Sequence, residues 1–125
     1  MKTQLVKLSK TAGWIAFALG IIHTAYTVLI VKDIAALEMQ WRSTFLFMYV
    51  AAGFGCLLAG GTMLIATSKE IRNIRSAHHL FLISAIFMLL LGIGAPIAMS
   101  ENPFGYISLV VGVFATGVWL LRFRK

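Results

Sequence analysis

Residues 11–31 read TAGWIAFALGIIHTAYTVLIV and contain no lysine, arginine, aspartate or glutamate. As a helix that rises ~1.5 Å per residue, this segment spans ~30 Å, about the thickness of the hydrocarbon core of a bilayer. The whole chain has 125 residues, of which 60% are hydrophobic and 12% are charged. Soluble domains average ~25% charged residues, so the composition indicates an integral membrane protein with several spans.

Three further segments also lack these charged residues: 43–67, 80–99 and 105–121. Backbone groups in lipid must be hydrogen-bonded within the protein, so each of the four segments is expected to be a helix. The short connections between them favour antiparallel neighbours. The sequence therefore predicts an all-α fold, a polytopic four-helix bundle with up-down-up-down topology. The whole chain, 1–125, would be a single transmembrane domain with an outer loop at 32–42 and a cytoplasmic loop at 68–79.

The basic residues indicate the orientation of this bundle. Nine of the eleven lysines and arginines lie before the first segment, between the second and third, or after the fourth; the exceptions are Lys32 and Arg42. Loops rich in lysine and arginine stay in the cytoplasm, so both termini are expected there, with the protein in the cell inner (plasma) membrane. The net charge of +7 is then a topology signal, and no nucleic-acid partner is expected.

Small residues recur on one face of the predicted helices. Gly20 lies on such a face in the first helix, Gly53, Cys56 and Gly60 share one in the second, and Gly112 belongs to one in the fourth. Lipid supplies no hydrophobic drive for helices to associate, and small residues let helix backbones approach closely. We expect these five residues to be helix-packing positions.

The cysteine and histidine pattern predicts no metal site. The chain has one cysteine and three histidines. His78 and His79 are adjacent, so they would point ~100° apart on a helix, whereas a chelating pair needs a spacing of three or four. We interpret them as contacts to the membrane interface.

His23 is the main candidate for a functional residue, because it lies deep within the first apolar segment. An ionisable side chain at that depth is costly and marks a possible site. Matching depths across antiparallel helices places it level with residues 52–53, 90–91 and 113–114. One interpretation is a neutral histidine that hydrogen-bonds between helices; the other is an imidazole that contacts protons or a ligand in an outward-opening pocket. The sequence leaves both open.

Other polar residues on the predicted outer half would form the remainder of such a ligand-binding site. They outline a polar route into the bundle by which a small anion or a polar headgroup could enter. These residues are Tyr26, Thr27, Arg42, Tyr49 and Glu101.

Three short stretches carry a family resemblance: Gly13-Trp14, the run GIIHT at residues 20–24, and Gly94-Ala95-Pro96. In these stretches the chain resembles a family of small bacterial four-helix inner-membrane proteins of unknown function. The resemblance implies four spans and a bacterial inner membrane, and it implies no activity. Small multidrug exporters are of similar size but carry a glutamate within the first membrane helix, where this chain has none.

Three functions are consistent with these observations. The first is an accessory or structural subunit, or a self-associating membrane component, without catalysis of its own. The second is a protein that binds or transports a small molecule or lipid in a pocket centred on His23. The third is a redox subunit that binds a quinone or haem, although b-type haem usually takes two histidines at matched depth.

No nucleophile–base pair or phosphate loop is visible, so no catalytic residue is predicted and an enzyme is not expected. No cofactor is predicted either, with haem or quinone left as alternatives. The expected partners are the lipid bilayer and either a second copy of the chain or a partner membrane subunit.

Overall fold

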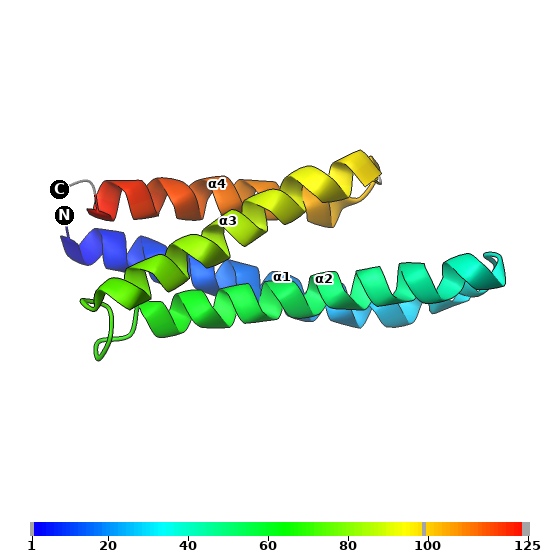
Figure 1. Cartoon of the computed structure of the whole chain (residues 1–125), viewed down its shortest axis with the longest axis horizontal. Helices are drawn as coiled ribbons and strands as arrows, with labels where there is room; N and C mark the ends of the chain where they lie inside the picture. Colours follow the sequence, from blue (N-terminus) through cyan, green and yellow to red (C-terminus); the bar gives the residue numbers. More distant parts are fainter. Residues whose placement is uncertain (1, 99, 124–125) are drawn as a thin grey trace.

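The computed structural model describes residues 2–98 and 100–123. Within them the chain forms four helices: α1 (Lys2–Ala35), α2 (Met39–Ala66), α3 (Arg75–Ala98) and α4 (Pro103–Phe123) (Figure 1). Each helix is long and apolar enough to cross a membrane. The all-α expectation with four span-like helices is therefore confirmed. The expected helix end at Met99 and the cations Arg124 and Lys125 lie outside the described residues.

The helices are longer than the apolar segments that predict them. The segment 32–42 was expected as a loop, but α1 continues to Ala35 and α2 begins at Met39. Backbone bonds tighten the short turn, with the Leu37 N–H donating to the Ile34 carbonyl over 3.1 Å. The length of an apolar segment indicates how much of a helix can lie in lipid. The helix itself can continue through polar residues such as Lys32, as long as its backbone hydrogen bonds continue.

α1 and α2 form a closely packed antiparallel hairpin. A Cβ atom built on Gly20 would lie 2.6 Å from the backbone nitrogen of Leu57, and one built on Gly60 would lie 2.8 Å from the carbonyl oxygen of Gly13. Only glycine leaves room for backbones this close.

α3 and α4 form a second hairpin of the same kind. A Cβ atom on Gly112 would lie 2.8 Å from the Cα atom of Leu89, and one on Gly105 would lie 2.7 Å from the ring of Pro96. Pro96 lies inside α3, in the last turns before the connection to α4. Close backbone contacts at glycines are thus made within each hairpin.

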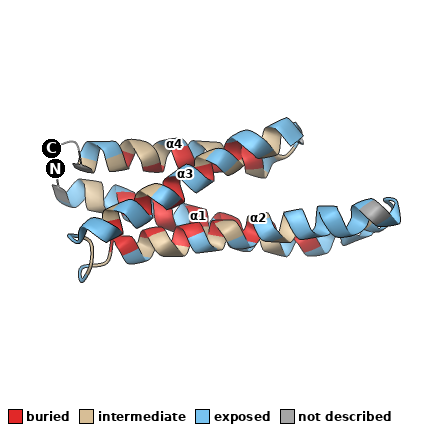
Figure 2. Cartoon of the chain, viewed as in Figure 1, coloured by how far each residue is buried: buried red, intermediate tan, exposed pale blue. Residues whose placement is uncertain are grey.

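The two hairpins meet along only part of their length. α1 begins and α4 ends at one end of the molecule, the terminal end; the α1–α2 and α3–α4 turns lie toward the other, the turn end (Figure 1). Buried residues such as Met63, Met88 and Ala115, each 0% exposed, form a core between the hairpins. Figure 2 shows that burial is concentrated away from the tip of the α1–α2 hairpin.

The α1–α2 hairpin extends beyond the α3–α4 hairpin at the turn end (Figure 1). Phe104, the second residue of α4, contacts His23, and α1 continues for twelve residues after His23 to Ala35. At ~1.5 Å per residue this is an extension of ~18 Å. We call residues 28–47 the projecting tip. Apolar side chains on it are exposed, including Val28 at 75% and Phe47 at 73%.

Candidate functional site

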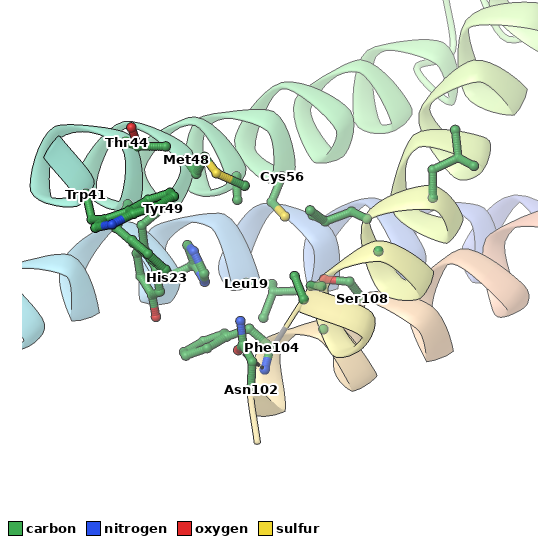
Figure 3. A pocket seen from close by; sticks show the side chains of 18 residues that line it. Leu19, His23, Trp41, Thr44, Met48, Tyr49, Cys56, Asn102, Phe104 and Ser108 are labelled. Carbon is green, nitrogen blue, oxygen red and sulfur yellow. Dashed lines mark hydrogen bonds between the residues drawn. The ribbon is translucent and has the colours of Figure 1, made fainter. Parts of the chain in front are cut away.

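A cavity of about 500 Å³ lies between the two hairpins on the turn-end side of the core, and all four helices contribute to its walls (Figure 3). It extends from Cys56 and Ser108 at its inner end to Trp41 and Asn102 toward the turn end. None of its lining residues is an aspartate, glutamate, lysine or arginine. We call it the His23 cavity.

Small residues on α3 and α4 make room for the His23 cavity. Gly94, Ala95 and Ala98 line it from the last turns of α3, and Gly105 lines it from the first turn of α4. The facing surface of α2 carries large side chains, with Met48 among them. Small groups on one wall and large ones on the other leave a space whose lining is almost entirely apolar.

His23 lies at the wall of this cavity, 5% exposed, between two aromatic rings (Figure 3). The Tyr49 ring is stacked on the imidazole, with centroids 4.0 Å apart and planes 13° apart. The Phe104 ring meets it edge-on at 4.8 Å and 89°. Because Tyr49 belongs to α2 and Phe104 to α4, three helices hold the imidazole in position.

The Nε2 atom of His23 is buried and has no hydrogen-bond partner among the described residues. Leaving a buried polar group without a partner costs about 1–3 kcal/mol. Buried polar groups nearly always have a partner, so an orphaned one requires an explanation, such as a site that receives a group from outside the chain.

Tyr26 and Thr27 lie near the cavity without lining it. The Tyr26 ring packs against Phe104, with centroids 5.7 Å apart. Thr27 is 6% exposed, and its hydroxyl donates to the carbonyl of His23 over 3.2 Å. This bond satisfies the hydroxyl within α1, as threonines in membrane helices commonly do. Thr27 therefore supports the helix backbone at His23 rather than the ring.

The structure does not bring Arg42 and Glu101 into this cluster. The Arg42 side chain donates from Nε to the Leu37 carbonyl over 2.6 Å, which ties it to the turn between α1 and α2. Glu101 is exposed in the turn between α3 and α4. Neither residue lines the His23 cavity, and among the described residues no ion pair joins them. The expected polar route is thereby reduced to His23 and Tyr49, with Tyr26 beside them.

The expected depth of His23 relative to α4 was wrong. Residues 113–114 were placed level with it, but the ring that contacts it belongs to Phe104. The shift arises because the α1–α2 hairpin extends beyond the other, a relationship that depth counting from the apolar segments does not contain.

Sequence reasoning also missed several residues of the site, among them Phe104, Trp41 and Asn102. Phe104 lies just before the apolar segment 105–121 that was expected to form the fourth helix. One signal was present, because Phe104 lies four residues before Ser108, on the small-residue face that also holds Gly112. Nothing in the sequence pattern placed Trp41 or Asn102 at the cavity.

The helix-packing candidates lie at contacts between helices. Gly20, Gly53 and Gly60 lie where α1 meets α2, and Gly112 lies where α4 meets α3. Cys56 is 2% exposed with a free thiol, and it lines the inner end of the cavity.

The described residues contain no cluster of three or more histidine, cysteine, aspartate or glutamate side chains suited to a metal ion. The arrangement around His23 is suited to binding an apolar molecule and offering it one polar contact. In comparisons with models of known protein families, with curated proteins and with solved structures, nothing matched the chain.

Proposed function

We propose that this chain is a multi-pass protein of the inner (plasma) membrane, an up-down-up-down bundle with both termini in the cytoplasm. Four helices of sufficient length and apolarity support the spans. The lysines and arginines at the start of α1, between α2 and α3 and at the end of α4 support the orientation. The turn end would then face outward.

We propose further that the protein binds an uncharged, elongated lipophilic molecule in the His23 cavity. The observation that carries this proposal is the buried Nε2 atom of His23, which has no partner among the described residues although His23 is one of the residues that line an apolar cavity of about 500 Å³. Ligand sites are commonly apolar cavities of this size with few polar groups that fix orientation.

The ligand class follows from the lining. With no charged side chain in the wall, a charged ligand group would lose its hydration without compensation, so the part inside the cavity is neutral. A neutral imidazole has one donor and one acceptor nitrogen, so an oxygen of a hydroxyl or carbonyl group can bond to Nε2. Trp41, Thr44 and Asn102, toward the turn end of the cavity, suit a polar headgroup. A long-chain alcohol, a lipid or a quinone fits this description.

The experiment is native mass spectrometry of the full chain in mild detergent, together with its visible absorption spectrum. Wild type is expected to retain the mass of a neutral lipophile, and His23→Phe is expected to lose it. The matched control is Ile22→Ala, because Ile22 is adjacent in sequence but 56% exposed on the outer surface of α1. A Soret band would instead identify haem and overturn the proposed ligand class.

A titration with defined probes tests the charge preference. Dodecanol and dodecanoate have the same chain length, and only the second is anionic. We expect dodecanol to bind the wild type and dodecanoate to bind much more weakly. Equal binding of dodecanol and dodecanoate would contradict the proposal. So would the binding of neither probe, if the purified protein also carries no bound lipophile; His23 would then be a contact between helices.

A second candidate function is self-association or docking on a partner membrane subunit through the projecting tip. The supporting observations are that the α1–α2 hairpin extends beyond the α3–α4 hairpin (Figure 1) and that large apolar side chains of the projecting tip, such as Val28 and Phe47, are exposed. The test is the oligomeric state in lipid nanodiscs, for wild type and for Phe47→Ala. A fixed oligomer that Phe47→Ala dissociates would support it; a wild-type monomer that recruits no stoichiometric subunit would contradict it.

A further inference from the structure

A second cavity lies at the terminal end, on the opposite side of the core from His23, and has a volume of about 470 Å³. Four cationic side chains line it: Lys7, Lys10, Arg72 and Arg122. They come from the first turns of α1, the connection between α2 and α3, and the end of α4. We call it the basic cavity. Positions far apart in the sequence thus gather positive charge around one space.

Hydrogen bonds around one backbone carbonyl hold part of this cavity in place. The carbonyl oxygen of Arg72 accepts a bond from Nε2 of His78 at 2.8 Å and another from Nη2 of Arg122 at 3.1 Å. The indole N–H of Trp119 donates to the carbonyl of His78 over 3.0 Å. The connection between α2 and α3 is therefore fastened to α3 and α4, which holds Arg72 and Arg122 near each other before any ligand arrives.

Among the described residues, no aspartate or glutamate lines the basic cavity to compensate its charge. The carboxylate of Glu70, which is fully exposed, interacts with Lys10. The pKa of Glu70 is lowered first by hydrogen bonds from its own backbone N–H and the Ser68 side chain, and then by the charges of Lys69 and Lys10. Glu70 can offset Lys10, whereas no described aspartate or glutamate of the cavity wall faces Lys7 or Arg72.

We propose that the basic cavity binds a phosphate group. Arginine and lysine are the side chains that recognise phosphate, the first through paired hydrogen bonds and the second as a point charge. The half-buried side chains of Leu5 and Val6 form an apolar part of the wall. An apolar surface next to a phosphate site favours the headgroup of an anionic phospholipid over free phosphate, and basic pockets between membrane helices bind such headgroups.

This proposal is independent of ligand binding at His23. The basic cavity and the His23 cavity share no lining residue. Loss of a neutral lipophile in His23→Phe would leave phosphate binding unchanged. Loss of phosphate binding would leave the neutral ligand in place.

The experiment is native mass spectrometry of the full chain titrated with phosphatidylglycerol, with phosphatidylcholine as the zwitterionic comparison. The test variant is Lys7→Gln with Lys10→Gln, whose side chains are exposed. The matched control is Lys69→Gln with Arg75→Gln, two exposed cations near the same end that do not line the cavity. Each cation near a membrane surface contributes about fivefold in affinity for anionic lipid, so the test variant is expected to weaken phosphatidylglycerol binding about thirtyfold.

The control variant is expected to change that binding less than about threefold, because screened charges outside the cavity contribute little. An equal loss in both variants would overturn the proposal, since it would show general attraction to the surface. So would equal binding of the two lipids by the wild type. A second variant, Arg72→Lys with Arg122→Lys, keeps the charges but loses the paired hydrogen bonds of arginine, so it should weaken phosphatidylglycerol binding without abolishing it.

Inorganic phosphate distinguishes the two sources of the group. If the lipid occupies the site, millimolar phosphate should displace it weakly, and phosphate alone should not protect the protein from thermal unfolding. If phosphate alone protects the wild type but not Lys7→Gln with Lys10→Gln, the site is confirmed with the free ion as its occupant. Protection by neither phosphate nor phosphatidylglycerol would overturn the proposal.

Discussion

The imidazole of His23 and the ring of Tyr49 lie stacked, with centroids 4.0 Å apart and planes 13° apart, across the contact between α1 and α2. Aromatic pairs in such an offset arrangement contribute about 0.5–1.5 kcal/mol beyond the apolar area that they bury. The stack fixes the ring while Nε2 is left without a partner among the described residues. A rigid ring with an unused polar atom is a favourable starting point for a ligand contact, because little entropy remains to be lost on binding.

Replacing His23 by phenylalanine separates the two interpretations of this residue. His23→Phe keeps a ring on Tyr49 and removes the unpartnered Nε2, but it also removes the interaction of the imidazole with the Tyr49 backbone, so the free energy of unfolding of ligand-free protein should rise by less than about 1 kcal/mol. Equilibrium unfolding in mixed detergent measures it. A loss of about 2 kcal/mol or more would show that His23 makes a stabilising hydrogen bond between helices, and the ligand proposal would lose its main support.

Phe104 is expected to be the most sensitive residue of the cavity wall contributed by α4. Phe104→Ala removes the ring that meets His23 edge-on and also contacts Tyr26, so unfolding free energy should fall by about 2 kcal/mol. The comparison is Phe54→Ala, because Phe54 is 54% exposed on α2 and should cost less than about 1 kcal/mol. Equal effects of the two changes would contradict the placement of Phe104 at the site.

Two neighbouring glycines of α2 should respond in opposite directions to the same substitution. A Cβ atom on Gly60 would meet the backbone of Phe17 and Gly13, whereas one on Gly61 would meet nothing within 4 Å. Gly60→Ala should therefore destabilise the protein by about 1–3 kcal/mol through overpacking. Gly61→Ala should be neutral or stabilise it by up to about 1 kcal/mol, because alanine favours helix. Thermal unfolding of the two variants measures the difference. A Gly60→Ala variant as stable as Gly61→Ala would contradict the close packing at Gly60.

Labelling of introduced cysteines tests the proposed orientation. In a Cys56→Ser background, Glu101→Cys should react with a membrane-impermeant maleimide in intact cells, because Glu101 is exposed in the α3–α4 turn. Lys69→Cys, also exposed but near the terminal end, should react only after the cells are permeabilised. The reverse pattern would place the termini outside and overturn the orientation inferred from the basic residues.

Local sequence properties were sufficient to predict the helices. Segment length, absence of charge and the need for internal backbone bonding depend on neighbouring residues alone, so all four helices were predictable. The same applies to His23, whose depth in the first apolar segment is visible by counting. The stacking partner Tyr49 was also among the expected residues, because depth matching placed residues 52–53, about one helical turn away, level with His23.

Only the tertiary structure decided which residues of the two hairpins meet. The chain joins α2 to α3 through eight residues, 67–74, which do not fix how far one hairpin slides along the other. Close backbone packing at glycines such as Gly60 and Gly112 fixes the register within each hairpin, but no such contact was predicted between them. For that reason Phe104 takes the place beside His23 that residues 113–114 were expected to hold, while Arg42 and Glu101 remain outside the cavity. A sliding position of this kind depends on the fit of side chains across the whole interface, and no single stretch of sequence contains it.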